Sequence, residues 1–287
     1  MKIFDTHVHY NLEPILDDWE RYWQAAQNCG VAKAAVIGTN LETSRQAVAL
    51  AAKKPEALIA SIGLHPENAE AWLRESDGDL EAATTKMRED VAQLQQLSQK
   101  ATFAAWGEIG LDFFRLNHEG KPWELTRQLQ VAVLREQLNL ARGSGKAVIF
   151  HVRDDEQFYD LPEGAQQTLL SLISELDYTN EPMIFHCFSG SRAYLEKVLA
   201  LPRSMVSFAG NVTFKSAHQL RELAALVPAK RLLVETDSPF LAPEPKRGQF
   251  CQPAFIVHTA RLLSEKCGAD LAQVYQNSLA IFGQSEV

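Results

Sequence analysis

The chain has 287 residues, of which 46% are hydrophobic and 22% are charged, and its formal charge is −8. This length can bury a large core, and no linker rich in glycine, serine or proline divides it, so we expect a single domain over 1–287. The acidic balance argues against the broad basic face of a duplex-coating protein, and no apolar run is long enough to span a membrane. Scattered cysteines and the lack of a leader sequence predict a cytoplasmic protein.

Apolar runs that resemble strands alternate with helix-like segments along the whole chain. Several runs are nearly continuous in Val, Ile, Leu, Phe and Ala, as expected for parallel strands buried on both faces. The predicted strands are 2–8, 33–37, 58–64, 103–111, 147–151, 183–186, 205–208 and 232–235. The predicted helices are 15–28, 42–53, 79–99, 123–142, 164–176, 193–201, 217–226, 254–266 and 271–282.

This alternation of strands and helices favours an α/β fold, the closed (β/α)8 TIM barrel. The nearest alternative is an open doubly wound sheet with one strand wrongly assigned. No Gly-x-Gly-x-x-Gly turn follows the first strand, so a dinucleotide-binding function has no support. In a barrel the carboxyl ends of the strands converge, so residues distant in the sequence meet on one face.

Side chains that bind metal ions lie at the ends of these strands. His7 and His9 should project from the same side of the first strand, although alone this pair fits a hydrogen-bonded polar strand end better than a metal site. Further ligand types accompany later strands: Glu108, His151, His186 and Asp237. The whole set exceeds what one tetrahedral zinc needs, and so many buried ionisable groups are costly without a cation. We therefore expect two divalent ions that share a carboxylate.

Paired ions activate a water and stabilise the attacking and leaving oxygens of a displacement at phosphorus. Hydrolysis is therefore the expected chemistry. It needs no nucleophilic serine or cysteine, and we expect Cys187 to be a packing residue. Imidazole-rich sites favour Zn²⁺, Mn²⁺ or Fe²⁺ over Mg²⁺, which prefers oxygen ligands.

Several motifs occur in the order, and at roughly the spacing, of one known family. They are Asp-Thr-His-Val-His, Gly-Leu-His-Pro, Gly-Glu-Ile-Gly-Leu-Asp, His-Val-Arg-Asp, His-Cys-Phe-Ser-Gly and Glu-Thr-Asp-Ser-Pro-Phe-Leu. From residue 4 to about 283 the chain resembles the TatD-related deoxyribonucleases, metal-dependent hydrolases of the amidohydrolase-like superfamily with TIM-barrel folds. Any one motif is weak evidence, whereas the ordered series is strong.

The resemblance implies a role for each metal-binding residue. His7, His9 and Asp237 bind the first ion, Glu108 bridges, and His151 and His186 hold the second. Asp237 also takes a proton from the attacking water. Asp237 and Glu108 are therefore the expected catalytic residues. The family is usually Mg²⁺-dependent, so the two ions are expected to be Mg²⁺, Mn²⁺ or Zn²⁺.

The resemblance also implies that His65 and Arg153 contact the substrate phosphate. An ordinary salt bridge explains Arg153 as well as a substrate contact does, and a structural role for His65 is only slightly less favoured. Two further sets of polar residues carry no assigned role. Asp5, Asp112 and Glu235 either orient the ligands or form buried hydrogen bonds, while His118, His218 and His258 are expected on the surface or in helix packing.

Two segments depart from the family pattern. The loop 247–253 lacks the usual Lys and Asn, which affects the expected substrate preference more than metal binding. The segment 66–105 is longer than usual, and it follows the third strand, so it can overhang the pocket. Within it, 79–99 is predicted to be a surface helix with one face on the barrel, and docking of a protein partner there is an alternative use.

The main expectation is a phosphodiesterase that trims single-stranded DNA or RNA from an end. The first alternative is hydrolysis of another ester or amide, such as an aminoacyl-tRNA ester or a small cyclic amide, on the same metal pair. The second is a subunit of a larger assembly that docks through 79–99.

Overall fold

The computed structural model describes residues 2–114 and 121–285, and these residues form an eight-stranded sheet. The strands follow one another in sequence order and each neighbouring pair is parallel. They are β1 Ile3–Val8, β2 Val31–Val36, β3 Leu58–Ile62, β4 Ala105–Asp112, β5 Ala147–Arg153, β6 Met183–Phe185, β7 Ser204–Phe208 and β8 Leu232–Val234. Each overlaps a predicted strand, so the predicted TIM barrel is confirmed over the open sheet.

The barrel closes between β1 and the residues that follow β8. Val8 pairs in parallel with Ser238, the backbone N–H of Asp237 donates to the His7 carbonyl over 2.9 Å, and that of His9 donates to the Ser238 carbonyl over 2.8 Å. Because these bonds join the two ends of the sheet, residues more than two hundred positions apart lie on neighbouring segments.

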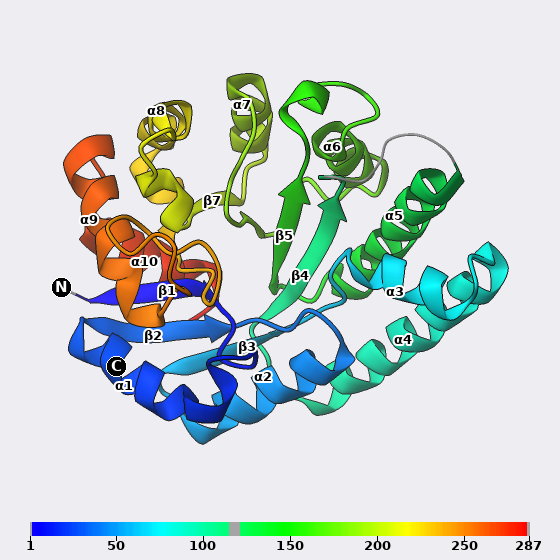
Figure 1. Cartoon of the computed structure of the whole chain (residues 1–287), viewed down its shortest axis with the longest axis horizontal. Helices are drawn as coiled ribbons and strands as arrows, with labels where there is room; N and C mark the ends of the chain where they lie inside the picture. Colours follow the sequence, from blue (N-terminus) through cyan, green and yellow to red (C-terminus); the bar gives the residue numbers. More distant parts are fainter. Residues whose placement is uncertain (1, 115–120, 286–287) are drawn as a thin grey trace.

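Helices surround the strands on the outside, as Figure 1 shows. They are α1 Trp19–Asn28, α2 Leu41–Lys53, α3 Asn68–Glu75, α4 Leu80–Lys100, α5 Lys121–Ala141, α6 Ala165–Glu175, α7 Arg192–Ala200, α8 His218–Leu226, α9 Ile256–Cys267 and α10 Leu271–Ile281. Short 3₁₀ turns lie at Leu16–Asp18, Glu156–Phe158, Gly210–Thr213, Ala229–Arg231 and Pro253–Phe255. Among the described helices, none combines the length and the apolar character that crossing a bilayer requires.

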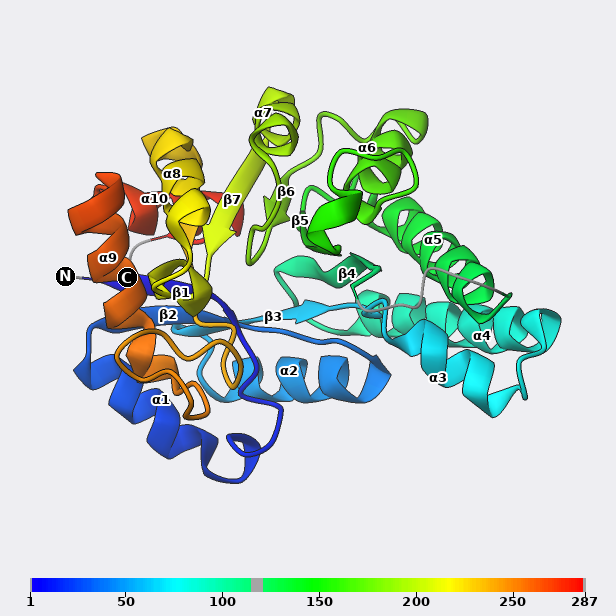
Figure 2. The same cartoon turned by 45° about the horizontal axis from the view of Figure 1, so that its top comes forward.

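The long segment after β3 contains one helix that the sequence analysis did not predict. This helix, α3, buries Ala69, Trp72 and Leu73, whose spacing is that of one helical face. The predicted helix α4 buries Ala83, Met87, Val91 and Leu94 on one side, as expected of a surface helix. Figure 2 shows α3, α4 and α5 side by side, so the extra residues thicken the outer layer of the barrel.

The interior of the barrel is packed with apolar side chains at the amino ends of the strands. Phe4, Ile149 and Leu233 belong to one buried cluster with Leu279 and Phe282 from the C-terminal region. The rings of Phe4 and Phe282 stack with their centroids 5.4 Å apart. The helix α10 therefore plugs this end, whereas polar residues gather at the opposite end.

Candidate metal centre

The carboxyl ends of the strands surround a cavity of about 660 Å³, and all six predicted metal ligands meet there or directly beside it. His7 lies in β1, His9 directly after it, Glu108 in β4, His151 in β5, His186 directly after β6, and Asp237 after β8. All are buried except His151, which is half-buried. The convergence expected of a barrel therefore occurs.

The carboxylate of Glu108 stands at the centre of this cluster, with each oxygen facing a different pair of histidines. Its Oε2 lies 3.2 Å from Nε2 of His7 and 4.0 Å from Nε2 of His9. Its Oε1 lies 2.7 Å from both Nδ1 of His151 and Nε2 of His186. The Glu108 carboxylate thus lies between two groups of nitrogen donors.

The donor atoms on the Oε2 side have the spacing that one cation requires. Four ligands about 2.1 Å from an ion in a tetrahedron lie about 3.4 Å from one another. Oδ1 of Asp237 lies 3.4 Å from Nε2 of His9 and 3.6 Å from Nε2 of His7, close to that value. Among the described residues, neither ring nitrogen of His7 has a hydrogen-bond partner. Buried polar atoms are rarely left this way, so the donor set fits a bound cation.

An irregularity in β4 aims Glu108 into this cluster. The pairing of β4 with β5 is regular up to Trp106 and again from Ile109, but Gly107 and Glu108 between them face a single residue of β5, Ile149. Such a bulge turns a side chain toward a site. Gly107 has φ +147°, and a Cβ there would lie 2.7 Å from the Ile149 Cβ, so the bulge requires glycine.

The cluster keeps its carboxylate ionised although it is buried. Burial alone raises the pKa of Glu108, but His186, His7 and His65 outweigh it and hold that pKa well below its ordinary value. Burial also opposes the charged form of His186, yet Glu108 raises the pKa of His186 well above its ordinary value. A ring nitrogen must lose its proton to bind a metal, so cations and protons compete for these histidines.

Asp112 orients the ring of His151. Its Oδ2 accepts a hydrogen bond from Nε2 of His151 over 2.9 Å, and its Oδ1 accepts one from the Phe114 backbone N–H over 3.0 Å. The other ring nitrogen, Nδ1, is thereby directed at Glu108, 2.7 Å from its Oε1. Burial lowers the pKa of His151, but Asp112 and Glu108 together raise it to about 9. Of the two roles left open for Asp112, this geometry supports ligand orientation.

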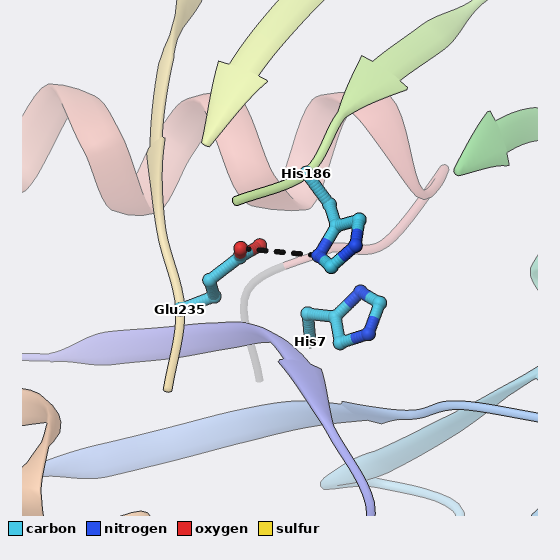
Figure 3. Close-up of side chains that lie close together, drawn as sticks. All are labelled: His7, His186 and Glu235. Carbon is cyan, nitrogen blue, oxygen red and sulfur yellow. Dashed lines mark ion pairs between the residues drawn. The ribbon is translucent and has the colours of Figure 1, made fainter. Parts of the chain in front are cut away.

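Glu235 faces the ring of His186, as Figure 3 shows. Its Oε1 lies 3.3 Å from Nδ1 of His186 and also accepts a hydrogen bond from the Cys187 backbone N–H over 2.6 Å. On the other side, the rings of His186 and His7 stack with centroids 3.9 Å apart. The imidazole of His186 is therefore held with Nε2 toward Glu108. Asp5, by contrast, accepts hydrogen bonds from Thr236 and acts in closing the barrel.

The backbone is strained where two strands end at the site. Cys187 has φ +43° and Asp237 has φ +57°, a left-handed conformation that costs free energy for residues other than glycine. Asp237 is held there by its bond to the His7 carbonyl, and the structure thereby aims its carboxylate at the histidines. Burial, followed by the negative charge of Asp237, raises the pKa of the Cys187 thiol well above its ordinary value, which supports a packing role for that cysteine.

His65 and Arg153 both line the cavity, as predicted. Nδ1 of His65 accepts a hydrogen bond from the Glu67 backbone N–H over 3.2 Å, so its proton is on Nε2, which lies 3.7 Å from Oε1 of Glu108. Burial and the neighbouring His151 lower the pKa of His65 to about 3, so the ring is a neutral donor. The exposed Arg153 lies 3.9 Å from the centre of the Phe114 ring, and in the described part of the chain no carboxylate lies within ion-pairing distance of it. Among the described residues, the structure therefore gives Arg153 no salt bridge.

The cavity also has lining residues that the sequence analysis did not select. These are chiefly Glu67, Tyr159, Asn211 and Phe240. Phe240 is 52% exposed and meets His9 edge-on at 5.9 Å. The sequence feature that could have identified Phe240 is its place in the motif Glu-Thr-Asp-Ser-Pro-Phe-Leu, three residues after the predicted ligand Asp237.

The two atypical segments contribute little to this cavity. Of 66–105, Glu67 is the described residue that lines it, so most of the segment does not overhang the pocket. The loop 247–253 packs beside the site through Cys251, which is buried and donates its backbone N–H to the Pro239 carbonyl over 2.8 Å. His218 is exposed and His258 is half-buried on α9, as expected for histidines outside the site, while the prediction for His118 falls outside the described residues.

Comparison with known proteins places this geometry in a family. The model of the family described as TatD related DNase matches residues 4–284. A Mycoplasma pneumoniae protein described as an uncharacterized metal-dependent hydrolase is 32% identical over 281 residues, which cover 96% of each chain. An Erwinia amylovora protein described as the 3'-5' ssDNA/RNA exonuclease TatD is 28% identical and covers 98% of this chain and 100% of its own. The crystal structure of YjjV, a TatD homolog from Escherichia coli, superposes with a TM-score of 0.78 at 28% identity and covers 99% of this chain and 98% of its own. The chain therefore belongs to the TatD related DNase family and is a metal-dependent hydrolase of that type.

Proposed function

We propose that this enzyme is a two-metal phosphodiesterase that removes nucleotides from the ends of single-stranded DNA or RNA. The observation that carries the proposal is the position of Glu108, whose two oxygens face separate pairs of histidine nitrogens. A shared carboxylate of this kind is the mark of a two-metal hydrolytic site. The description of the Erwinia amylovora relative as a single-strand exonuclease supports the substrate class.

The donor atoms divide into two sets. His7, His9 and Asp237 form the first set with Oε2 of Glu108, and His151 and His186 form the second with Oε1. Divalent ions held by these two sets would polarise the phosphodiester and would favour loss of a proton from water. The many nitrogen donors favour Zn²⁺ or Mn²⁺, with Mg²⁺ as the third candidate.

The side chains at the cavity have distinct tasks. Asp237 combines a pKa below its ordinary value with a place on the cavity wall, so its carboxylate is ionised and can accept the proton of the attacking water. His65 offers the Nε2 proton to a non-bridging phosphate oxygen, and Arg153 offers a guanidinium without an ion-pair partner among the described residues. As the water oxygen bonds to phosphorus, the scissile P–O bond breaks, and the proton that Asp237 accepted from the water passes to the leaving oxygen.

Phe240 favours a nucleic-acid substrate over other esters. Its ring is 52% exposed on the wall of the cavity, next to His9. An exposed aromatic face stacks on any nucleobase, with a contribution of about 1–3 kcal/mol per base. A concave cavity of about 660 Å³ at the mouth of a barrel accepts a strand end more readily than the middle of a duplex.

The test is hydrolysis of single-stranded oligonucleotides labelled at either end, with Mg²⁺, Mn²⁺ or Zn²⁺ added to protein stripped by a chelator. We expect stepwise shortening that needs added metal, and the labelled end that survives gives the polarity. Glu108→Gln and His151→Ala should abolish it, since each removes a ligand, whereas His218→Ala is the matched control because His218 is an exposed histidine on α8.

Intact oligonucleotides with every metal would refute the proposed substrate. Turnover of an aminoacyl ester or a cyclic amide by the same protein, lost in Glu108→Gln, would then favour the alternative hydrolase function. Activity retained by Glu108→Gln would refute the metal assignment itself. Co-purification of a protein partner that depends on α4 would support the docking role for 79–99 without deciding the substrate.

A further inference from the structure

The end of the barrel opposite the metal centre has a second cavity, of about 860 Å³, that shares no lining residue with the first. Its walls come from α2, the start of β3, the turns that precede β4 and β5, and residues 280–284 at the end of α10. We propose that this cavity binds a small organic phosphate, with the phosphate held by Lys100, Lys146 and Arg203. The proposal concerns a separate site and does not depend on the proposed function of the metal centre.

The charged residues that line this cavity in the described part of the chain are of one sign. Lys100, Lys146 and Arg203 line it, and no acidic side chain of the described residues does. In the described part of the chain none of the three forms an ion pair, whereas exposed cations elsewhere do, as in Lys86–Glu75 at 3.0 Å. Three cations without an ion-pair partner among the described residues, in a chain of net charge −8, make a local field that attracts a multiply charged anion. A phosphate monoester carries close to two negative charges at neutral pH.

Two of the three cations are already held in place. The Lys146 ammonium lies 4.9 Å from the centre of the Phe103 ring, and that lysine is half-buried. The Arg203 guanidinium donates through Nη1 to the Asn180 carbonyl over 3.4 Å, which leaves its other N–H groups for a ligand. Side chains that are ordered before binding lose less conformational entropy when they bind.

The remaining walls call for a ligand larger than inorganic phosphate. Val48, Pro55 and Ile281 line the same cavity and supply apolar surface. A volume of about 860 Å³ falls within the range of about 300–1,000 Å³ typical of sites for small molecules. The chemistry that matches is a phosphate group joined to an uncharged organic body, of the size of a nucleoside monophosphate.

The experiment measures binding of AMP to the metal-free, full-length protein by titration calorimetry. The metal centre can also bind a phosphate, so Arg153→Ala serves as the control for that site. We expect Lys146→Ala and Arg203→Ala each to weaken AMP binding about tenfold, the effect of losing one charge-assisted hydrogen bond, and the double variant to remove it. Lys86→Ala, which removes a cation outside both cavities, should leave the affinity unchanged.

Three further measurements make the outcome decisive. Adenosine and inorganic phosphate should each bind at least tenfold more weakly than AMP. If inorganic phosphate bound as tightly as AMP, the apolar walls would not contribute to binding, and the proposal that the ligand is an organic phosphate would be overturned. Loss of AMP binding in Arg153→Ala but not in Lys146→Ala would assign all binding to the metal centre and overturn the proposal as a whole. Lys146→Arg and Arg203→Lys keep the positive charges and should therefore retain AMP binding. Thermal unfolding of each variant shows whether it is folded, so that a loss of binding caused by misfolding is recognised.

Discussion

Replacing Asp112 with asparagine tests whether this residue orients the second half of the metal centre. Both carboxylate oxygens accept hydrogen bonds, from His151 over 2.9 Å and from the Phe114 N–H over 3.0 Å, whereas an asparagine amide has a single acceptor oxygen. One of the two donors must therefore face an NH₂ group. A hydrogen bond to a charged group contributes about 1.5–3 kcal/mol. At about 1.4 kcal/mol per factor of ten, Asp112→Asn should weaken metal binding by His151 about tenfold to a hundredfold.

The assay is competition for Zn²⁺ or Mn²⁺ against a chromophoric chelator, which reports affinity without requiring turnover. Wild type should show two classes of bound metal, and Asp112→Asn should weaken one of them while leaving the other within about threefold. Glu67→Gln is the matched control. Its carboxylate also approaches a histidine of the site, at 3.8 Å from Nδ1 of His65, but it is 81% exposed, so its removal should have a small effect.

Two results would contradict this reasoning. If Asp112→Asn bound both metals as tightly as wild type, the ring of His151 would be held by its other contacts and the hydrogen bond would have no orienting role. If Glu67→Gln weakened binding as much as Asp112→Asn, the loss would reflect the total negative charge near the cavity and not the direction of one imidazole.

Three further outcomes are expected. Gly110→Ala should lower the free energy of unfolding by at least about 2 kcal/mol in urea denaturation, because Gly110 has φ +152° and a Cβ there would collide with the His151 carbonyl; unchanged stability would contradict this. Phe240→Ala should raise KM for single-stranded DNA about tenfold through lost stacking, with kcat on a small phosphodiester unchanged, as steady-state kinetics would show. In thiol titration, the exposed Cys29 should react in the native protein, whereas Cys251, which is buried and whose pKa burial raises to about 12, should react only after unfolding.

The fold could be predicted from the sequence because its strands are buried on both faces and therefore form continuous apolar runs. The ends of the strands were less accessible to prediction. β5 continues to Arg153, two residues beyond its predicted end, because it pairs with β4 as far as Asp112. The short helix α3 was missed although its buried residues repeat at helical spacing, since eight residues give a weak periodic signal.

The candidate ligands could be predicted because they stand at strand ends, where barrel closure brings distant residues together. Their arrangement around Glu108 could not, because it depends on a bulge in the pairing of β4 with β5, and strand register is not visible in one sequence. The roles of Asp112 and Glu235 stayed open for a related reason. A buried carboxylate has the same sequence signature whether it bonds a backbone amide or the far side of a liganding imidazole.

The second cavity could not be predicted at all. Lys100, Lys146 and Arg203 each stand alone in the sequence, among residues of mixed character. They line one cavity because the turns at the amino ends of the strands and the end of α10 surround it, which is a property of the closed barrel.

The shared carboxylate of Glu108 has an evolutionary consequence. Since one oxygen faces each group of histidines, a single substitution at this position removes a donor from both groups at once. A change at His151 or His186, by contrast, affects only one group. A descendant that loses one half of the cluster is therefore expected to change these histidines and to keep the glutamate.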